Sequence, residues 1–199
     1  MLTFDSITHR YLYSGRQVRS VTGMIKAAGL LGPAAEFYSK ESAQRGTRVH
    51  QACLNLDRGK TCTNGDEALL DSYTRWRDLI QPMWTSMEEP QYSERYNLAG
   101  TADRLGTIND KPVVVDLKTG APAAWHGLQL ALYDLLYDDL PHMIRRRIAV
   151  YLKKDGRTAQ SVEYRQLGDY VTAFNLLRGH NNDDNDTNDD NDTRSEAEP

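Results

Sequence analysis

Apolar and polar positions alternate with two different periods along the 199 residues of this chain, and the period changes from helical to strand-like near its middle. Between residues 66 and 80, apolar side chains recur three or four positions apart, which places them on one face of a helix. After residue 90, short apolar runs are separated by turn-forming residues, a pattern typical of strands. The chain is therefore expected to contain both structures in one α/β domain.

The individual segments follow from these periods and from the glycines, prolines and capping residues between them. The pattern predicts helices over residues 22–30, 35–57 (interrupted near Gly46), 66–80 (capped by Asn64), 124–137 (amphipathic) and 168–177. It predicts a hairpin over residues 3–18, strands over 92–97, 99–108 and 112–118, and a second hairpin from 146–153 and 158–165. Pro82 and Pro90 bracket a predicted loop. This order indicates a central mixed sheet with helices on its faces.

The apolar run Val113-Val114-Val115 leads directly into an acid and a base, Asp116 and Lys118. Asn109-Asp110, just before this strand, is a favourable two-residue hairpin turn. If these two residues form the turn, counting outward along both strands places Asp103 opposite Asp116, with Cβ atoms roughly 4.5–5.5 Å apart. Lys118 lies on the same face because strand side chains alternate. Two opposed carboxylates beside a buried run favour a cation between them, and a divalent metal is the natural candidate.

The formal charge of −4 is divided unevenly along the chain. From His180 onward there are eight acidic residues and Arg194, a formal charge of −7, so residues 1–179 carry +3. We expect residues 1–179 to form a single domain that is compatible with a polyanionic partner. The Asn/Asp-rich segment 180–199 has almost no apolar residues and is expected to be disordered.

Other classes of protein are disfavoured by composition. No run of eighteen apolar residues is present and the N-terminal residues do not resemble a signal peptide, so we expect a cytoplasmic protein without a membrane span. Cys53 and Cys62 are too few for a disulfide framework or a four-cysteine iron–sulfur cluster.

Three motifs in order resemble a known family: Gly-Thr-Ala-Asp at 100–103, Asp-Leu-Lys-Thr-Gly at 116–120 and Gln-Leu-Ala-Leu-Tyr at 129–133. They are similar to the nuclease motifs of the PD-(D/E)XK superfamily, in particular its RecB-like exonuclease branch, which includes phage recombination nucleases. Gly46-Thr47-Arg48-Val49-His50 resembles the helical histidine motif of that branch. The resemblance covers residues 1–178 and implies a restriction-endonuclease-like core.

The resemblance also implies roles for individual residues. It assigns His50, Asp103, Asp116 and the backbone carbonyl of Leu117 to a Mg²⁺ (or Mn²⁺) site, and Lys118 to catalysis together with the two aspartates. It assigns Gln129 and Tyr133, which share a helix face, to contacts with nucleic acid. Ala102 stands where the superfamily name has proline, and the second acid is aspartate, as is usual in this branch. The cysteines of its iron–sulfur subgroup are missing.

Two further features are open to more than one interpretation. Glu94, one strand earlier, is either an additional ligand or outer acid of the metal site, or an exposed glutamate. The basic run 145–147, with Lys153-Lys154 nearby in sequence, either follows a phosphate backbone or is solvated charge at a sheet edge.

The function expected from these residues is metal-dependent hydrolysis of phosphodiester bonds in DNA by an exonuclease serving phage recombination or DNA processing. The alternatives are a structure-specific endonuclease of the same fold and a catalytically silent nucleic-acid-binding or assembly module. Because residues 1–179 are only mildly basic, we expect processive work to need a ring-shaped homo-oligomer or a recombination partner protein.

Overall fold

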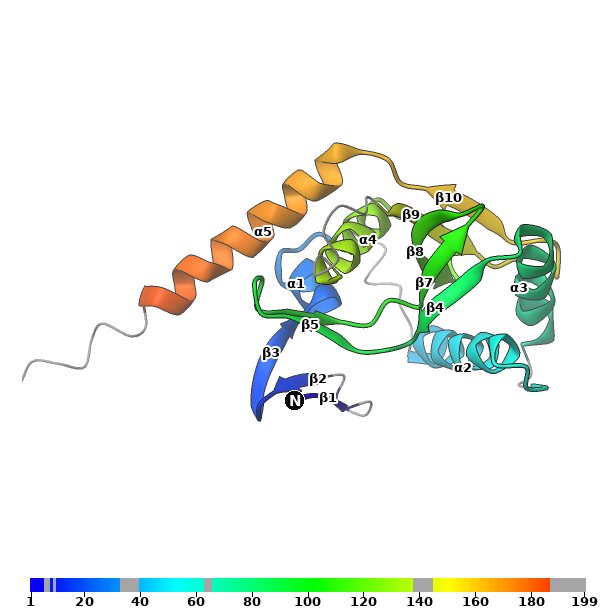
Figure 1. Ribbon diagram of the computed structural model, residues 1–199, viewed down its shortest axis with the longest axis horizontal. Coiled ribbons are helices and arrows are strands. Elements are labelled where there is room, and N and C mark those ends of the chain that lie inside the picture. The colour runs from blue at the N-terminus through cyan, green and yellow to red at the C-terminus, as the bar shows by residue number, and fades with distance from the viewer. Residues whose placement is uncertain (6–7, 9, 33–39, 63–65, 138–144, 187–199) are drawn as a thin grey trace, which may run out of the picture.

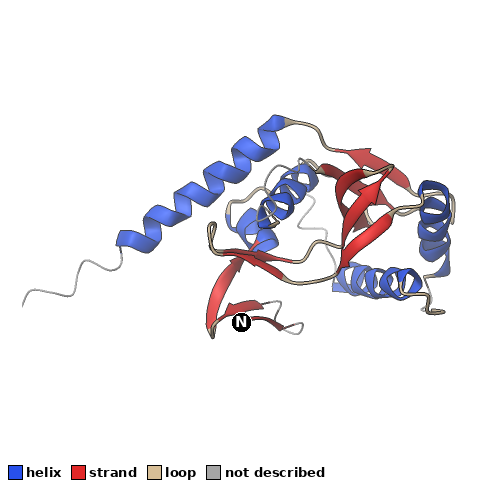
Figure 2. Ribbon diagram, viewed as in Figure 1, coloured by secondary structure: helices blue, strands red, loops and turns tan. Residues whose placement is uncertain are grey.

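The structure is a computed structural model that describes the chain except residues 6–7, 9, 33–39, 63–65, 138–144 and 187–199. The described part contains helices and two five-stranded sheets (Figures 1 and 2). The helices are α1 (Val21–Ala27), α2 (Lys40–Asp57), α3 (Glu67–Ile80), α4 (Trp125–Leu136) and α5 (Leu167–Asp186). The strands are β1 (Leu2–Asp5), β2 (Arg10–Tyr13), β3 (Arg16–Ser20), β4 (Met83–Met87), β5 (Gln91–Ser93), β6 (Leu98–Gly100), β7 (Arg104–Ile108), β8 (Lys111–Lys118), β9 (Arg146–Tyr151) and β10 (Gln160–Glu163).

The central sheet has the strand order β10-β9-β8-β7-β4. Strands β8 and β9 pair in parallel and the other neighbours pair antiparallel, so the predicted mixed sheet is confirmed. Helices α2 and α3 cover one face, where Val113, Val115 and Leu117 join their core, whereas Val114 packs on the opposite side with α4. Strand β8 is thus buried on both faces, which explains its continuous apolar run.

The predicted hairpin turn is confirmed. Ile108 pairs with Lys111, and the register continues to Arg104 opposite Val115. Asn109 and Asp110 have φ values of 50° and 59°, the left-handed conformation at both central positions that a two-residue turn of this type requires. Pairing ends one step before Asp103 and Asp116, so their predicted opposition falls just beyond the ladder.

The predicted strand over 99–108 is wrong as a single element. It is divided between two sheets: β6 belongs to the second sheet, of order β1-β2-β3-β6-β5, and β7 belongs to the central sheet. The chain crosses between them at Thr101-Ala102-Asp103. Gly100 permits this crossing, because a Cβ there would lie 2.8 Å from Leu136 Cδ1 and 2.9 Å from Val21 Cγ2. Asp103 is consequently freed from strand pairing at the place where the two sheets meet.

The loop predicted between Pro82 and Pro90 is also wrong, because it contains β4, the edge strand that pairs with β7. An edge strand tolerates flanking prolines since one of its sides needs no partner. The pairing is irregular between Trp84 and Ser86. Gly106 of β7 fits closely against this strand: a Cβ at that position would lie 1.9 Å from the Met83 carbonyl oxygen.

The helices differ from expectation in detail. Helix α2 runs through Gly46 without the predicted interruption, and Asp66 precedes α3, while Asn64 lies outside the described residues. Helix α4 was predicted to be amphipathic but is buried from His126 to Leu136, since both sheets, α1 and α5 surround it. None of the described helices is long and apolar enough to cross a membrane.

Helix α5 is longer than predicted. It continues to Asp186 and so includes the first part of the segment expected to be disordered, whereas residues 187–199 lie outside the described part. Figure 1 shows α5 lying beside α4 and then extending away from the body of the fold.

Candidate active site

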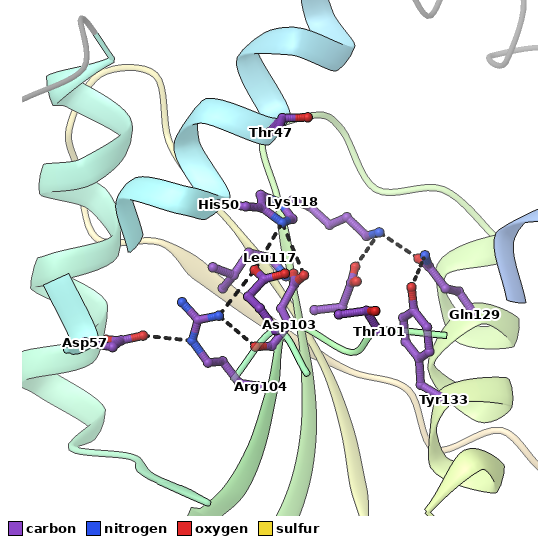
Figure 3. Close-up of polar contacts among 12 residues, drawn as sticks. Thr47, His50, Asp57, Thr101, Asp103, Arg104, Leu117, Lys118, Gln129 and Tyr133 are labelled. Carbon is purple, nitrogen blue, oxygen red and sulfur yellow. Dashed lines mark hydrogen bonds and ion pairs between the residues drawn. The ribbon is translucent and has the colours of Figure 1, made fainter. Parts of the chain in front are cut away.

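Four parts of the fold bring polar side chains together where the two sheets meet (Figure 3). They are the C-terminal end of β8, the crossing segment before β7, the middle of α2 and the first half of α4. Asp103 and Asp116 are almost fully buried, at 5% and 3% exposure, beside His50 and Lys118. Charged groups buried this deeply need charged or hydrogen-bonding partners.

Asp103 is held through both of its carboxylate oxygens. Oδ1 lies 3.1 Å from His50 Nδ1, and Oδ2 accepts a 2.5 Å hydrogen bond from the backbone N–H of Leu117. A strand residue directs its N–H and C=O to the same side, so the Leu117 carbonyl also faces Asp103. The structure therefore places three of the predicted metal-binding groups next to one another.

The third acidic group of this site, Glu88, is a residue that the sequence did not reveal. Ligand atoms of His50, Glu88 and Asp103 all lie within 4.8 Å of one another. Glu88 directly follows β4 in a left-handed conformation, φ 54°, and its backbone N–H donates to the Asp103 carbonyl. Its position depends on β4, which had been interpreted as a loop. The sequence signal that could have located Glu88 is Met83-Trp84-Thr85, if it is interpreted as the start of an edge strand.

The structure does not bring Glu94 into this group. Glu94 lies beyond β5 and accepts a hydrogen bond from the Tyr13 hydroxyl at 2.5 Å, in the second sheet. The aromatic rings of Tyr13 and Tyr92 stack there at 4.2 Å.

The basic run 145–147 is engaged in ion pairs rather than free for a phosphate backbone. Arg145 pairs with Asp134 and Arg147 with Asp169, each at 3.0 Å, and Arg146 pairs with Glu163 at 2.8 Å. Arg145 and Arg147 are buried, so this run joins α4, α5 and the sheet. Neither interpretation offered by the sequence describes it.

Lys118 is positioned by a chain of contacts that ends on α4. Its ammonium forms an ion pair with Asp116 and donates to Gln129 Oε1 at 2.7 Å. Gln129 Nε2 in turn donates to the Tyr133 hydroxyl at 3.2 Å. The Trp125 ring lies 5.0 Å from the ammonium, a cation–π distance. Gln129 and Tyr133, for which the sequence predicted contacts with nucleic acid, thus lie in a hydrogen-bonded chain that begins at the lysine.

The pKa values in this cluster reflect burial and mutual repulsion. Burial alone would lower the pKa of His50, but Asp103 and Glu88 raise it to about 9. Burial, reinforced by the Asp103 carboxylate, raises the pKa of Glu88 to about 7. Burial also raises the pKa of Asp116, although Lys118 opposes this. For Asp103 the balance is reversed, because His50 and the Leu117 amide outweigh burial and lower its pKa.

Arg104 supports the cluster from the side away from Lys118 (Figure 3). This fully buried side chain donates from Nε to Asp57 at 2.7 Å and from Nη1 to the Asp103 carbonyl at 2.6 Å. Its Nη1 also lies 3.4 Å from Glu88, and Tyr73 donates to the same Asp57 oxygen at 2.6 Å. One guanidinium thus connects α2 to the two segments that carry the acids.

These donors suit a divalent metal. Asp103, Glu88, Asp116 and a backbone carbonyl are hard oxygen ligands of the kind Mg²⁺ prefers, and the imidazole of His50 also suits Mn²⁺. Because the pKa of His50 is raised to about 9, its protonated ring provides the positive charge that these carboxylates require when no metal is bound. Binding of a metal would release that proton. The residues present therefore fit a divalent cation.

The roles of Glu88 and Glu94 can be separated with one substitution at each. We expect Glu88→Gln to raise the Mn²⁺ concentration that half-saturates the site about tenfold or more, because the site loses an anionic group. Glu94→Gln, a matched change in the second sheet, should shift that concentration less than twofold. Metal titrations of activity and of binding by calorimetry would measure both. A larger effect of Glu94→Gln would show that Glu94, and not Glu88, contributes to metal binding.

Comparison with known proteins agrees with the geometry. The sequence profile of the PD-(D/E)XK nuclease superfamily matches residues 25–196. No curated protein matches the chain. Among solved structures, the crystal structure of SSO0001 is 18% identical, with a TM-score of 0.38 over 80% of this chain and 72% of the other. That of LHK-Exo in complex with dAMP is 10% identical, with a TM-score of 0.39 over 85% of this chain and 89% of the other. From the profile match over most of its length, the chain belongs to the PD-(D/E)XK nuclease superfamily.

Proposed function

We propose that this protein is a divalent-metal-dependent deoxyribonuclease of the RecB-like branch, acting as an exonuclease in phage recombination or DNA processing. The observation that carries the proposal is the convergence of His50, Glu88 and Asp103 within 4.8 Å, next to the ion pair of Asp116 and Lys118. Superfamily membership supports phosphodiester hydrolysis and divalent-metal dependence. The branch, the preference for DNA ends and the choice between Mg²⁺ and Mn²⁺ rest on the motifs alone.

The metal would be held by His50, Asp103, Asp116 and the Leu117 carbonyl, with Glu88 beside them. It would supply a Lewis acid that stabilises charge on the phosphate and lowers the pKa of the attacking water. The protein groups have separate tasks. The Leu117 amide and Arg104 hold Asp103 in place, and the pairing of His50 with Asp103 fixes the ring orientation.

Lys118 is the group placed to act on the reacting atoms. Its Nζ can donate a proton in a hydrogen bond to the attacking water or to a phosphoryl oxygen as negative charge develops there. Gln129 Oε1 accepts one hydrogen bond from the ammonium and Asp116 accepts another, which leaves one N–H donor for substrate. The Lys118 side chain is 15% exposed, so it is largely enclosed but still reached by solvent.

The deciding experiment compares end-labelled linear duplex, circular duplex, single-stranded DNA and RNA, each with Mg²⁺, Mn²⁺ or EDTA. We expect linear DNA to be degraded with either metal and to be stable in EDTA. A ladder growing from one labelled end would give the polarity. Cleavage of circles would replace the exonuclease with the endonuclease alternative, and no cleavage with any metal would favour the binding module.

A further inference from the structure

A cavity of about 210 Å³ adjoins the active site on the side of the second sheet. Its walls are the aromatic rings of Phe4, Tyr11 and Tyr133, and Ser20 and Thr22 also line it. The rings come from β1, β2 and α4, so the cavity lies between the N-terminal strands and the helix that orients Lys118. None of the catalytic roles discussed above uses this space.

Hydrogen bonds connect two of these walls to the catalytic groups through intervening residues. Tyr133 is bound to Gln129, which holds Lys118. The Tyr11 hydroxyl lies 2.9 Å from Thr101 Oγ1, in the segment that ends at Asp103. Burial raises the pKa of Tyr133 most, and the negative charges of Asp116 and Asp103 raise it further. Tyr133 and Gln129 therefore link this cavity to Lys118.

The shape and chemistry of the cavity favour a flat ring. A cavity of about 150 Å³ accepts benzene in another protein, so 210 Å³ is sufficient for a single aromatic ring with polar substituents. The Phe4 and Tyr11 rings are 4.6 Å apart, and Phe4 is 37% exposed, so part of this aromatic pair reaches solvent. Hydroxyl groups of Ser20 and Thr22 can meet the polar edge of such a ring.

We propose that this cavity binds an unpaired nucleobase of the DNA strand whose phosphate lies at Lys118. This inference rests on the proposed function, because it takes DNA as the substrate. Every nucleobase has a π-face that stacks on aromatic side chains regardless of sequence. A base in the cavity cannot remain paired in a duplex, so the protein acts on single strands or on ends that have opened. The cavity thereby determines the strandedness of the substrate.

Binding to two decanucleotides of equal charge tests this. One is dT10 and the other has the same phosphodiester backbone with abasic sugars throughout, and affinities are measured by fluorescence anisotropy in a Lys118→Ala background with Mg²⁺. We expect a preference for dT10. Phe4→Leu should reduce this preference about fivefold to a hundredfold, the range found for loss of one base–aromatic stack. Affinity for the abasic strand should not change.

Phe174→Leu is the matched control, since Phe174 is 41% exposed on α5 and makes its ring contact with Tyr96. Phe4→Trp keeps an aromatic face and should keep the preference, which separates stacking from a defect in folding. If the preference for dT10 is the same with Phe4, leucine or tryptophan at this position, the cavity does not bind a base, and the nuclease assignment is decided by the cleavage assay.

If the wild type prefers dT10 but cleaves no DNA, base binding is supported and the nuclease assignment is refuted. Failure to bind either strand would also refute base binding in the cavity, and the cleavage assay would still decide the nuclease assignment.

Discussion

Replacing Lys118 by alanine is expected to slow cleavage of linear DNA by about two to four orders of magnitude, the usual effect of removing a positioned proton donor. The residue is the only cation paired with Asp116 among the described contacts, and Gln129 holds it in one orientation. DNA binding and the folded state should persist, because the strand core is unaffected and Asp116, whose pKa is already raised by burial, can take up a proton once Lys118 is gone. Single-turnover cleavage rates, with circular dichroism and anisotropy alongside, measure the three properties.

Lys111→Ala provides a control in the same strand. Lys111 is the first residue of β8 and Lys118 the last, so the two substitutions remove the same side chain from opposite ends. Lys111 is exposed and faces Ile108 at the hairpin turn, and its loss should leave the rate within about twofold. Unchanged cleavage in Lys118→Ala would remove the lysine from the catalytic assignment, whatever the control does.

Replacing Arg104 by methionine is expected to lower the free energy of unfolding by about 3–5 kcal/mol, since it leaves buried acids without their cation. Asp57 has a side-chain exposure of 1% and relies on Arg104 at 2.7 Å, supported by Tyr73 and by a longer contact from Arg77 at 3.8 Å. For a chain of this size the loss corresponds to a fall in melting temperature of about 10 °C. Thermal and urea unfolding followed by circular dichroism would measure it.

Arg146→Met is the comparison for that prediction. Arg146 also forms a close ion pair, but it is 31% exposed and its partner Glu163 is 20% exposed, so its loss should cost no more than about 1 kcal/mol. Joint replacement of Arg104 by methionine and Asp57 by leucine should recover part of the stability, because both charges are then removed together. Equal stability of the Arg104 and Arg146 variants would show that the buried guanidinium does not support the fold as described.

Local sequence predicted the parts of the fold in which neighbours in the chain are also neighbours in space. The Asn109-Asp110 turn set the β7–β8 register, because only left-handed residues close so short a hairpin. The apolar run before Asp116 predicted a strand buried on both faces. The placement of Lys118 near Gln129 and of His50 near Asp103 followed from motifs, and the structure brings both pairs into contact.

Other features depended on contacts between distant segments. Residues 98–108 contain no breaker strong enough to indicate that they divide, and they separate at Thr101 because β3 pairs with one half while β8 pairs with the other. Strand β4 is recognisable only by its pairing with β7. Without that pairing, the sequence could not show that Glu88, rather than a nearby acid such as Glu94, lies beside Asp103. The basic run 145–147 resembles surface charge in the sequence, because its partners Asp134 and Asp169 are brought to it only by folding.

The motif residues could be read from the chain alone: two aspartates, a lysine and a histidine stand in the order and spacing typical of the PD-(D/E)XK superfamily. The folded arrangement was needed to find the groups beside them, namely Glu88, the buried Arg104 and the aromatic cavity that Tyr133 lines. The physical reason is that the motif residues are set by hairpin register and helix periodicity, which act over a few positions. The additional groups come from strands and helices whose association depends on burial of the whole core.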